Sequence, residues 1–296
     1  MSTVALVAGS SPAPAELAEP RRVAWQILRH HAKSFTWGAR LLPRRYRRDA
    51  AAIYAWCRRC DDAVDHAPDA ATAARAVVRL RGELDRIYAA NDQALELGDP
   101  VLAGFREVVR RRRLPRIHAD ELIDGMEMDL GRVRYQTFDE LLVYCHRVAG
   151  VVGLMMARVM GVTDERVLAR AADLGIAMQL TNICRDVAED AGLDRVYLPA
   201  ELLGAGESAA VAELLCRADG YYRSGDRGLA ALPAGCEAAI RAARLIYADI
   251  GREIAGRGFD VRAGRARVSG PRKLWLAVRA VVETAGARLA HKGRTP

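Results

Sequence analysis

Several features that the 296-residue sequence lacks limit what the protein can be. Aromatic residues make up only 6% of it, and no window alternates apolar and polar residues with the period of two that marks a half-buried strand. No apolar run reaches the roughly eighteen residues of a membrane-spanning helix. No basic segment of an export signal opens the chain. We therefore expect an all-α protein without a sheet, either soluble or peripheral to a membrane.

Cysteine is present but does not form the pattern of a metal or disulfide framework. Six cysteines lie mostly in apolar stretches, and only Cys57 and Cys60 have the C-x-x-C spacing. Because no second pair accompanies them, a zinc or redox site is disfavoured. The cysteines are expected to be reduced, as in a cytoplasmic protein.

Positive charge predominates, with 45 Lys and Arg against 37 Asp and Glu and a formal net charge of +8. Such a balance suits an anionic small molecule or an anionic membrane surface. Nucleic acid would also fit the charge. However, the arginines are scattered except in residues 110–113, and no aromatic-interleaved basic motif accompanies them. We therefore expect no nucleic-acid partner.

Hydrophobic residues, at 51% of the chain, are sufficient for one sizeable core. Residues 1–20 are small and punctuated by proline, which is typical of a disordered leader. Residues 21–290 are expected to form one helical domain, and residues 291–296 a polar tail. The apolar periodicity and the Pro and Gly breaks predict helices over about 21–34, 47–66, 68–91, 100–114, 118–134, 137–160, within 174–199, and over 208–227, 236–257 and 271–289.

The most informative stretch is LGIAMQLTNICRDVAEDAGLDRVYLP, residues 174–199. On a helix, Gln179, Asn182, Asp186 and Asp190 step by three, four and four, so they share one face. Apolar residues cover most of the remaining surface, and enclosed carboxylates need a compensating cation. A divalent ion carrying a phosphate-bearing ligand would supply it. For one such motif alone, a solvated acidic helix end is the simpler interpretation.

A second acidic pair favours a metal site over a solvated helix end. Asp61 and Asp65 repeat the spacing of four on the helix expected over 47–66, with Asp62 beside them. Like charges so spaced destabilise a helix by roughly 0.2–0.5 kcal/mol per pair in water, and a structural bundle gains nothing from two pairs. Magnesium ions bridging to a diphosphate would require them. Arg58 and Arg185 closely precede the first aspartate of each pair and could bind diphosphate oxygens.

Two other stretches allow more than one interpretation. On the helix expected over 137–160, Gly150 and Gly153 serve either tight helix packing or an open apolar channel. Tyr144 lies at the start of this strip, where its ring could stabilise a cationic intermediate. Asp129 fits a position near a site as well as it fits a solvated helix face.

Together, these motifs resemble the squalene/phytoene synthase family of prenyl-diphosphate condensing enzymes. The resemblance rests on LG-x-x-x-Q-x-x-N-I-x-R-D-V-x-E-D with R-x-Y-x-P in residues 174–199, and on Y-C-x-x-V-A-G-x-V-G in residues 144–153. The first acidic motif, residues 61–65, and the HAKSF segment, residues 31–35, agree with it. The resemblance extends over roughly residues 25–285, with the motifs in the order of the family.

The resemblance implies a single-domain, all-α isoprenoid-synthase bundle with a central apolar cavity. It also implies Mg²⁺, for which Mn²⁺ could substitute, held by Asp61, Asp62, Asp65, Asn182, Asp186 and Asp190. Catalytic roles would fall to Asp61, Asp65, Tyr144, Asp186 and Asp190. Substrate-binding positions would be His31, Ser34, Phe35, Arg58, Gln179, Asn182 and Arg185.

Within the family, residues 152–161, 195–199 and 267–274 are most similar to bacterial phytoene synthases. That similarity implies the Mg²⁺-dependent head-to-head (1′-1) joining of two geranylgeranyl diphosphates, through prephytoene diphosphate, to phytoene and diphosphate. No nicotinamide cofactor is expected, in keeping with the missing glycine-rich dinucleotide fingerprint. The expected location is the cytoplasm or the membrane periphery, with weak binding to anionic membranes because the product would be an insoluble oil.

Three alternatives remain from the sequence. The first is formation of squalene, presqualene diphosphate or dehydrosqualene from two farnesyl diphosphates. Terpene cyclisation is a weaker one, because Asn182, Asp186 and Asp190 only partly match the cyclase metal motif. The third is a non-catalytic relative that binds a partner protein, although such a protein would not need two complete acidic pairs.

Overall fold

The computed structural model describes residues 18–31, 33–89, 98–131 and 133–292, and within these ranges it contains helices and loops but no strand. The prediction of an all-α fold is therefore confirmed. Most of the expected leader lies outside the described residues, as does the end of the expected tail. The last residues of the expected leader already belong to the first helix, which begins at Ala18.

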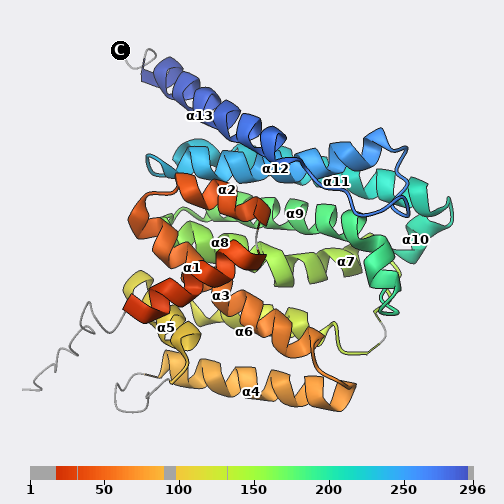
Figure 1. Ribbon diagram of the computed structural model, residues 1–296, viewed down its shortest axis with the longest axis horizontal. Helices are drawn as coiled ribbons and strands as arrows, with labels where there is room; N and C mark the ends of the chain where they lie inside the picture. Colours follow the sequence, from red (N-terminus) through yellow and green to blue (C-terminus); the bar gives the residue numbers. More distant parts are fainter. Residues whose placement is uncertain (1–17, 32, 90–97, 132, 293–296) are drawn as a thin grey trace, which may run out of the picture.

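The helices follow the predicted order closely (Figure 1). They are α1 (Ala18–His31), α2 (Lys33–Leu41), α3 (Arg44–Asp65), α4 (Ala70–Tyr88), α5 (Pro100–Arg112), α6 (Arg116–Glu127), α7 (Phe138–Cys145), α8 (Val151–Val159), α9 (Glu165–Ala191), α10 (Ala200–Leu203), α11 (Glu207–Asp226), α12 (Cys236–Gly256) and α13 (Gly270–Lys292). A π-helix, η1 (His146–Gly150), joins α7 to α8, and a short 3₁₀ helix, η2 (Leu229–Ala231), follows α11.

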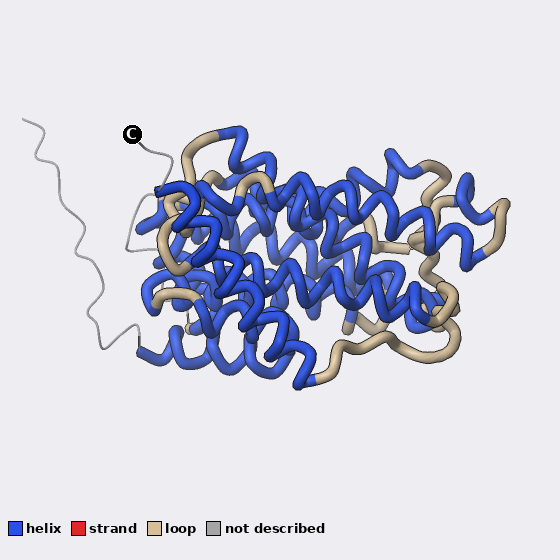
Figure 2. The backbone as a smooth tube through the Cα atoms, turned by 90° about the horizontal axis from the view of Figure 1, so that it is seen from above, coloured by secondary structure: helices blue, strands red, loops and turns tan. Residues whose placement is uncertain are grey.

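The helices are stacked in rows, from α4 at one edge of the molecule to α13 at the other (Figure 1). Seen from above, many of them run along the long direction of the molecule (Figure 2). Helix α9 lies in the middle of the stack and contacts α8, α11 and α12. The helix that carries the second acidic motif is thus enclosed by other helices, as its nearly continuous apolar surface predicts.

Two apolar clusters hold the bundle together. The first gathers side chains of α1, α3, α4, α5, α6 and α8, and at its centre Trp56 stacks on Phe105 with ring centroids 4.2 Å apart. The second gathers side chains of α7, α9, α11, α12 and α13, including the fully buried Leu141 and Leu180. Helix α3 belongs to the first cluster, whereas α9 contributes Leu168 to the first cluster and most of its buried side chains to the second, so the central helix joins the two.

The segment from α7 to α8 is one continuous helical stretch. The side chain of Thr137 accepts a hydrogen bond from the backbone N–H of Glu140 (3.3 Å), and the carboxylate of Glu140 accepts one from the N–H of Gln136 (2.6 Å). This confirms the predicted capping box, with the return bond displaced by one residue. The π-helix η1 widens the middle of the stretch, a feature that the apolar pattern did not predict.

This same stretch, Phe138–Val159, has the length and composition of a membrane span, which corrects the expectation that no segment does. Its side chains account for that composition within the fold. Leu141, Cys145, Val151 and Met155 are fully buried among the other helices. Core packing therefore explains the apolarity of this stretch.

The helix expected over 118–134 ends earlier, at Glu127, as α6. Met128, Asp129 and Leu130 continue as turns, and Gly131 adopts a left-handed φ of 90°, which ends helical geometry at little cost only for glycine. The early end moves Asp129 off the helix and into the turn that faces α7.

Small residues bring α9 into backbone contact with both η1 and α8. A Cβ added to Gly153 would lie 2.2 Å from the carbonyl oxygen of Ala171, and one added to Gly175 would lie 2.2 Å from that of Ala149. These distances are too short for any side chain. Tight helix packing, one of the two interpretations of the small-residue strip, is therefore present.

We predict that Gly175→Ala destabilises the protein by about 1–3 kcal/mol, because η1 and α9 must move apart to admit the methyl group. Gly82→Ala on α4 is the matched control, since nothing lies within 4 Å of its added Cβ. That control should be neutral or stabilising by up to about 1 kcal/mol. Thermal and urea unfolding measure both, and equal effects of the two substitutions would contradict the close approach.

Candidate active site

A cavity of about 750 Å³ lies between the two apolar clusters. Its walls come from α3, α6, α8, α9 and α12 and from residues 265–268, which precede α13. The lining residues of α9 run from Val167 to Arg185, a distance of about 27 Å at 1.5 Å per residue. The cavity is therefore long, and it follows the axis of the central helix.

The character of the wall changes along this axis. Near the C-terminal half of α9 it carries charged and amide side chains, namely Arg58, Asp61, Asp129, Gln179, Asn182, Arg185 and Arg265. Near the N-terminal half of α9 it is lined mainly by apolar and small side chains, among them Met156, Met160, Val167, Ala171, Leu174 and Met178. The small-residue strip thus lines an apolar channel as well as packing two helices, so both of its interpretations hold.

On α3, the carboxylates are held by a neighbouring guanidinium. Arg58 contacts Asp61 (Nη1–Oδ2 3.0 Å) and Asp62 (Nη2–Oδ1 2.5 Å). Asp61 lines the main cavity, whereas Asp62 lines a smaller cavity of about 390 Å³ on the adjacent side of the helix. Asp61 and Asp62 therefore face different spaces.

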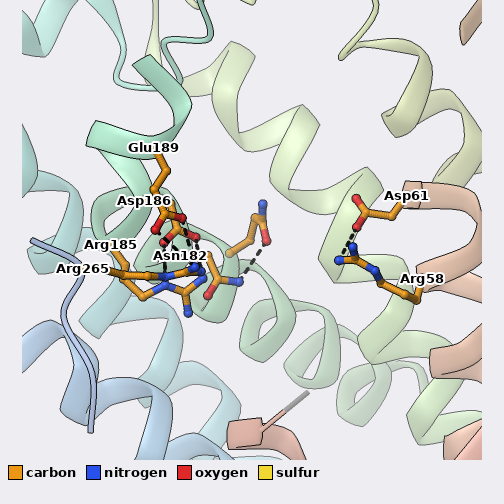
Figure 3. A network of polar contacts seen from close by, with 8 residues as sticks. Arg58, Asp61, Asn182, Arg185, Asp186, Glu189 and Arg265 are labelled. Atoms are coloured by element: carbon orange, nitrogen blue, oxygen red, sulfur yellow. Dashed lines mark hydrogen bonds and ion pairs between the residues drawn. The ribbon is translucent and has the colours of Figure 1, made fainter. Parts of the chain in front are cut away.

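On α9, two arginines converge on Asp186. Arg185 donates two hydrogen bonds to its carboxylate (2.7 and 2.5 Å), and Arg265, from the segment before α13, lies 3.0 Å from the same carboxylate and 3.0 Å from Glu189. Figure 3 shows this group on one side and the Arg58–Asp61 pair on the other. Asp61 and Arg185 line the same cavity, so each acidic motif has a residue in its wall, although Asp186 and Asp190 themselves are not among the lining residues.

Arg195, in the loop after α9, links the two acidic helices. Its Nη1 lies 2.8 Å from Oδ1 of Asp65 at the end of α3. The same guanidinium charge lowers the pKa of Asp129 and of Asp190 against the effect of burial. The guanidinium group of Arg195 therefore interacts with carboxylates from three separate parts of the chain.

Asp129 lies between the two acidic motifs. Its carboxylate accepts hydrogen bonds from the hydroxyl of Tyr144 (Oη–Oδ2 3.0 Å) and from that of Tyr197 (Oη–Oδ1 2.7 Å). The two tyrosine rings stack with centroids 5.1 Å apart. Of the two interpretations that its sequence position allowed, the structure supports the one near the site.

Three of these carboxyls ionise less readily than ordinary aspartates. Burial, and then the charge of Asp65, raises the pKa of Asp61 to about 6. Burial also raises the pKa of Asp129 to about 6, although both tyrosine hydroxyls oppose the shift. For Asp190, burial and the charge of Asp186 raise the pKa to about 7. An additional cation would stabilise all three in the charged form.

The amide face predicted on α9 is also present. Gln179 and Asn182 both line the cavity, and Nδ2 of Asn182 donates to Oε1 of Gln179 (3.3 Å). The other atom of that amide, Oδ1 of Asn182, is buried without a hydrogen-bond partner among the described residues. A buried oxygen without a hydrogen-bond partner is stabilised when a ligand supplies a hydrogen-bond donor or a cation.

The remaining predicted residues are placed as follows. His31 ends α1 and lines the cavity, where burial and the charge of Arg58 lower its pKa. The backbone of Ser34 and Phe35 belongs to α2, but their side chains lie outside the described part of the structure. Asp186 and Asp190 are on the predicted face of α9 and follow Asn182 and Arg185 along the helix. They are not among the residues that line the cavity.

The described residues contain no group of three or more His, Cys, Asp or Glu side chains arranged to hold a metal ion. Arg58, Arg185, Arg195 and Arg265 each contact an acidic side chain for which the family resemblance implies metal binding. Sequence reasoning missed Arg265 and Arg195, although the R-x-Y-x-P motif contained Arg195 and Tyr197 together.

The family assignment follows from a comparison with known sequences. The family model described as squalene/phytoene synthase matches residues 28–272. The chain belongs to the squalene/phytoene synthase family.

Relatives in this family resemble the chain over most of its length. A phytoene synthase of Pseudescherichia vulneris is 44% identical over 79% of this chain and 82% of that protein. A 15-cis-phytoene synthase of Enterobacter agglomerans is 36% identical over 88% of this chain and 94% of its own. Among solved structures, a dehydrosqualene synthase in complex with ligand superposes with a TM-score of 0.82 at 25% identity, over 92% of this chain and 99% of that one. The isoprenoid-synthase bundle is thus confirmed.

We predict that Asp129→Asn stabilises the ligand-free protein more at pH 8 than at pH 4. Because the folded protein raises the pKa of this carboxyl to about 6, folding is opposed as pH rises from the unfolded pKa through that value. Asparagine cannot ionise and escapes this cost, while its amide oxygen can still accept from a tyrosine. After allowance for solvent screening, we expect a difference of about 1–2 kcal/mol.

Urea unfolding of both proteins at pH 4 and pH 8 measures this difference. Asp219→Asn is the control, because Asp219 is exposed on α11 and pairs with Arg223 of the same helix. A stability difference between Asp129→Asn and the wild type that does not change with pH would show that Asp129 is not held in an environment that opposes its charge.

Proposed function

We propose that this chain is a prenyl transferase of the 15-cis-phytoene synthase type, which joins two geranylgeranyl diphosphates head to head to make phytoene for carotenoid biosynthesis. The observation that carries the proposal is its identity of 34–44% to phytoene synthases of several bacteria over 79–89% of the chain. The cavity supports it by combining a charged region with a long apolar one.

The charged region suits two diphosphates. Membership of the family supports a prenyl-diphosphate substrate and a divalent metal ion for binding its diphosphate. The donor set fits Mg²⁺, because Asp61 and Asp65 on α3, Asp186 and Asp190 on α9, and the unpartnered oxygen of Asn182 offer only hard oxygen ligands. Mn²⁺ would accept the same ligands. The metal would supply charge stabilisation for the departing diphosphate.

The arginines in this region complete the diphosphate site. Arg58, Arg185 and Arg265 line the cavity and contact carboxylates in the described structure. With those carboxylates holding metal ions, the guanidinium groups would be free to donate hydrogen bonds to diphosphate oxygens, whose geometry suits the guanidinium fork. The bound diphosphates would bring a negative charge of −2 or more into this region. Metal ions and arginines on both sides of the cavity would neutralise it.

The apolar region suits two long hydrocarbon chains. Loss of diphosphate from the first substrate breaks its C1–O bond and leaves an allylic cation, which the C2–C3 double bond of the second substrate attacks. Loss of a proton closes the cyclopropane ring of prephytoene diphosphate. A second ionisation, rearrangement and proton loss give phytoene, with no reductant required. Walls such as Met156, Leu174 and Met178 exclude water that would otherwise trap the cations.

Tyr144 is placed to stabilise these cations. Its ring is buried in the cavity wall next to the charged region, and Asp129 fixes the position of its hydroxyl. The face of a tyrosine ring attracts a nearby cation by about 0.5–2 kcal/mol. We propose this role for Tyr144, together with substrate contacts for His31, Ser34, Phe35, Gln179 and Asn182.

A second candidate is condensation of two farnesyl diphosphates. The superposition on a dehydrosqualene synthase favours it, because that structure is covered over 99% of its length. The lower identity of 25% makes it the weaker of the two. For either reaction, we propose a cytoplasmic enzyme at the periphery of an anionic membrane, since both products are insoluble hydrocarbons or their precursors.

Turnover of labelled substrates tests the proposal. With Mg²⁺, the protein should convert geranylgeranyl diphosphate to a C40 hydrocarbon, and EDTA should abolish the reaction. Asp61→Asn and Asp186→Asn should each lower kcat by about 10³-fold or more, because each removes a ligand on one side of the cavity. Asp219→Asn, on the surface of α11, should leave it unchanged.

Product analysis separates the candidates. A C30 product from farnesyl diphosphate, with geranylgeranyl diphosphate left unreacted, would replace the proposal with its alternative. No product from either substrate by the folded wild-type protein would favour a non-catalytic relative. Full activity of Asp61→Asn and Asp186→Asn would refute the assigned site.

A further inference from the structure

The outer face of α13 is an unusual concentration of exposed apolar side chains. Of the ten large apolar side chains that are exposed among the described residues, six lie on this helix. They are Leu274, Trp275, Val278, Val281, Val282 and Leu289, with exposed fractions of 45–73%. The other four are scattered over α4, α6, α7 and the loop after α9.

These six side chains form a continuous stripe. At 100° per residue they fall within an arc of about 120° of the helix surface. The residues that bury α13 against α12 and α2, including Leu276, Ala277 and Ala280, occupy the other side. We call these six residues the α13 stripe. Helix α13 therefore has two apolar faces, one packed against α12 and α2 and one that no other described residue covers.

The border of the stripe is cationic. The guanidinium groups of Arg272 and Arg279 lie over the ring of Trp275, 4.6 and 5.7 Å from its centroid. Ion pairs with Asp249 and Glu283 fix these two arginines in place. Tryptophan beside arginine at the edge of an apolar stripe is the pattern of a helix that lies in the interface of a bilayer.

The surrounding segment carries an excess of positive charge. Residues 257–288 contain two acidic residues, Asp260 and Glu283, and a larger set of basic ones: Arg257, Arg262, Arg265, Arg267, Arg272, Lys273, Arg279 and Arg288. Ion pairs with acidic residues outside the segment offset part of this charge, at Arg262, Arg265, Arg272 and Arg288. The excess that is left opposes a second copy of the same face, whereas it favours an anionic surface.

The α13 stripe is also joined to the cavity. Residues 265–268 and Lys273 line the cavity wall, and Leu274 and Trp275 follow directly as the first exposed members of the stripe. Helix α13 lies at the edge of the stack and extends beyond α12 (Figure 1). A flat surface could therefore meet the stripe, with the wall of the cavity beside it.

We infer that the α13 stripe is the surface by which this protein docks on an anionic lipid bilayer. Docking there places residues 265–273 between the bilayer and the cavity, where a prenyl diphosphate can leave the lipid and a hydrocarbon product can return to it. This inference deepens the proposed function by naming the membrane-facing surface. Its test is a binding measurement without substrate, so it can fail while the proposed reaction stands.

Flotation of the full chain with vesicles tests the docking surface. The wild-type protein should bind vesicles of phosphatidylglycerol and phosphatidylcholine, and bind pure phosphatidylcholine more weakly. The double substitution Val278→Glu/Val282→Glu should lower the partition coefficient for the anionic vesicles by about tenfold or more, because two carboxylates replace side chains that enter the interface. Val78→Glu/Ile117→Glu, at comparably exposed positions on α4 and α6, should bind as the wild type does.

Quenching by brominated lipids gives a second measurement that needs no charged substitution. Fluorescence of the wild-type protein should fall in brominated vesicles, and Trp275→Phe should remove most of that fall. Equal binding by Val278→Glu/Val282→Glu and the wild type, or undiminished quenching in Trp275→Phe, would overturn the inference. So would a wild-type dimer that Val278→Glu/Val282→Glu converts to a monomer while vesicle binding is unchanged.

Discussion

Carboxylates gathered around one cavity repel each other, and the structure depends on how that repulsion is balanced. The acidic side chains of α3, α9 and the turn after α6 are balanced by Arg58, Arg185, Arg195 and Arg265. The balance is incomplete, since Asp61, Asp129 and Asp190 keep raised pKa values. A protein that only needed to fold would gain stability by replacing some of these groups. Their presence is therefore best explained by ligands that bring further cations and anions into the cavity.

The arginines connect this balance to the architecture. Arg265 comes from the segment before α13 and Arg195 from the loop after α9, so each ties a peripheral segment to a central helix. Binding of cations by the carboxylates would release these guanidinium groups. The segment 265–268 also lines the cavity, and it leads into the α13 stripe. Arg265, part of the cavity wall and the proposed membrane surface thus belong to one continuous part of the chain.

The sequence predicted the helices and the two acidic faces well because both are local properties. A spacing of four places Asp61 and Asp65, or Asp186 and Asp190, on one side of any helix. The sequence alone could not show that Arg195 contacts Asp65, because those residues lie 130 positions apart. Only the packing of α3 beside the loop after α9 brings them together.

Three other features could not be predicted from the sequence, because they too depend on the tertiary structure. The apolar periodicity continued past Glu127, whereas the helix ends there and the following turn directs Asp129 toward two tyrosines. The π-helix η1 left no trace in the apolar pattern. The dual use of the small-residue strip became visible only when Gly153 and Gly175 were seen against the backbone of a facing helix.

The central claim is that the acidic motifs of α3 and α9 hold divalent cations together across one cavity. Crystals grown with Mn²⁺ and a non-reactive thio analogue of a prenyl diphosphate would test it most directly, by anomalous scattering of the manganese. The account predicts manganese peaks beside Asp61 and Asp65 and beside Asp186 and Asp190, with the diphosphate of the analogue between them. Full occupancy of the cavity by the analogue with no manganese at either motif would contradict it.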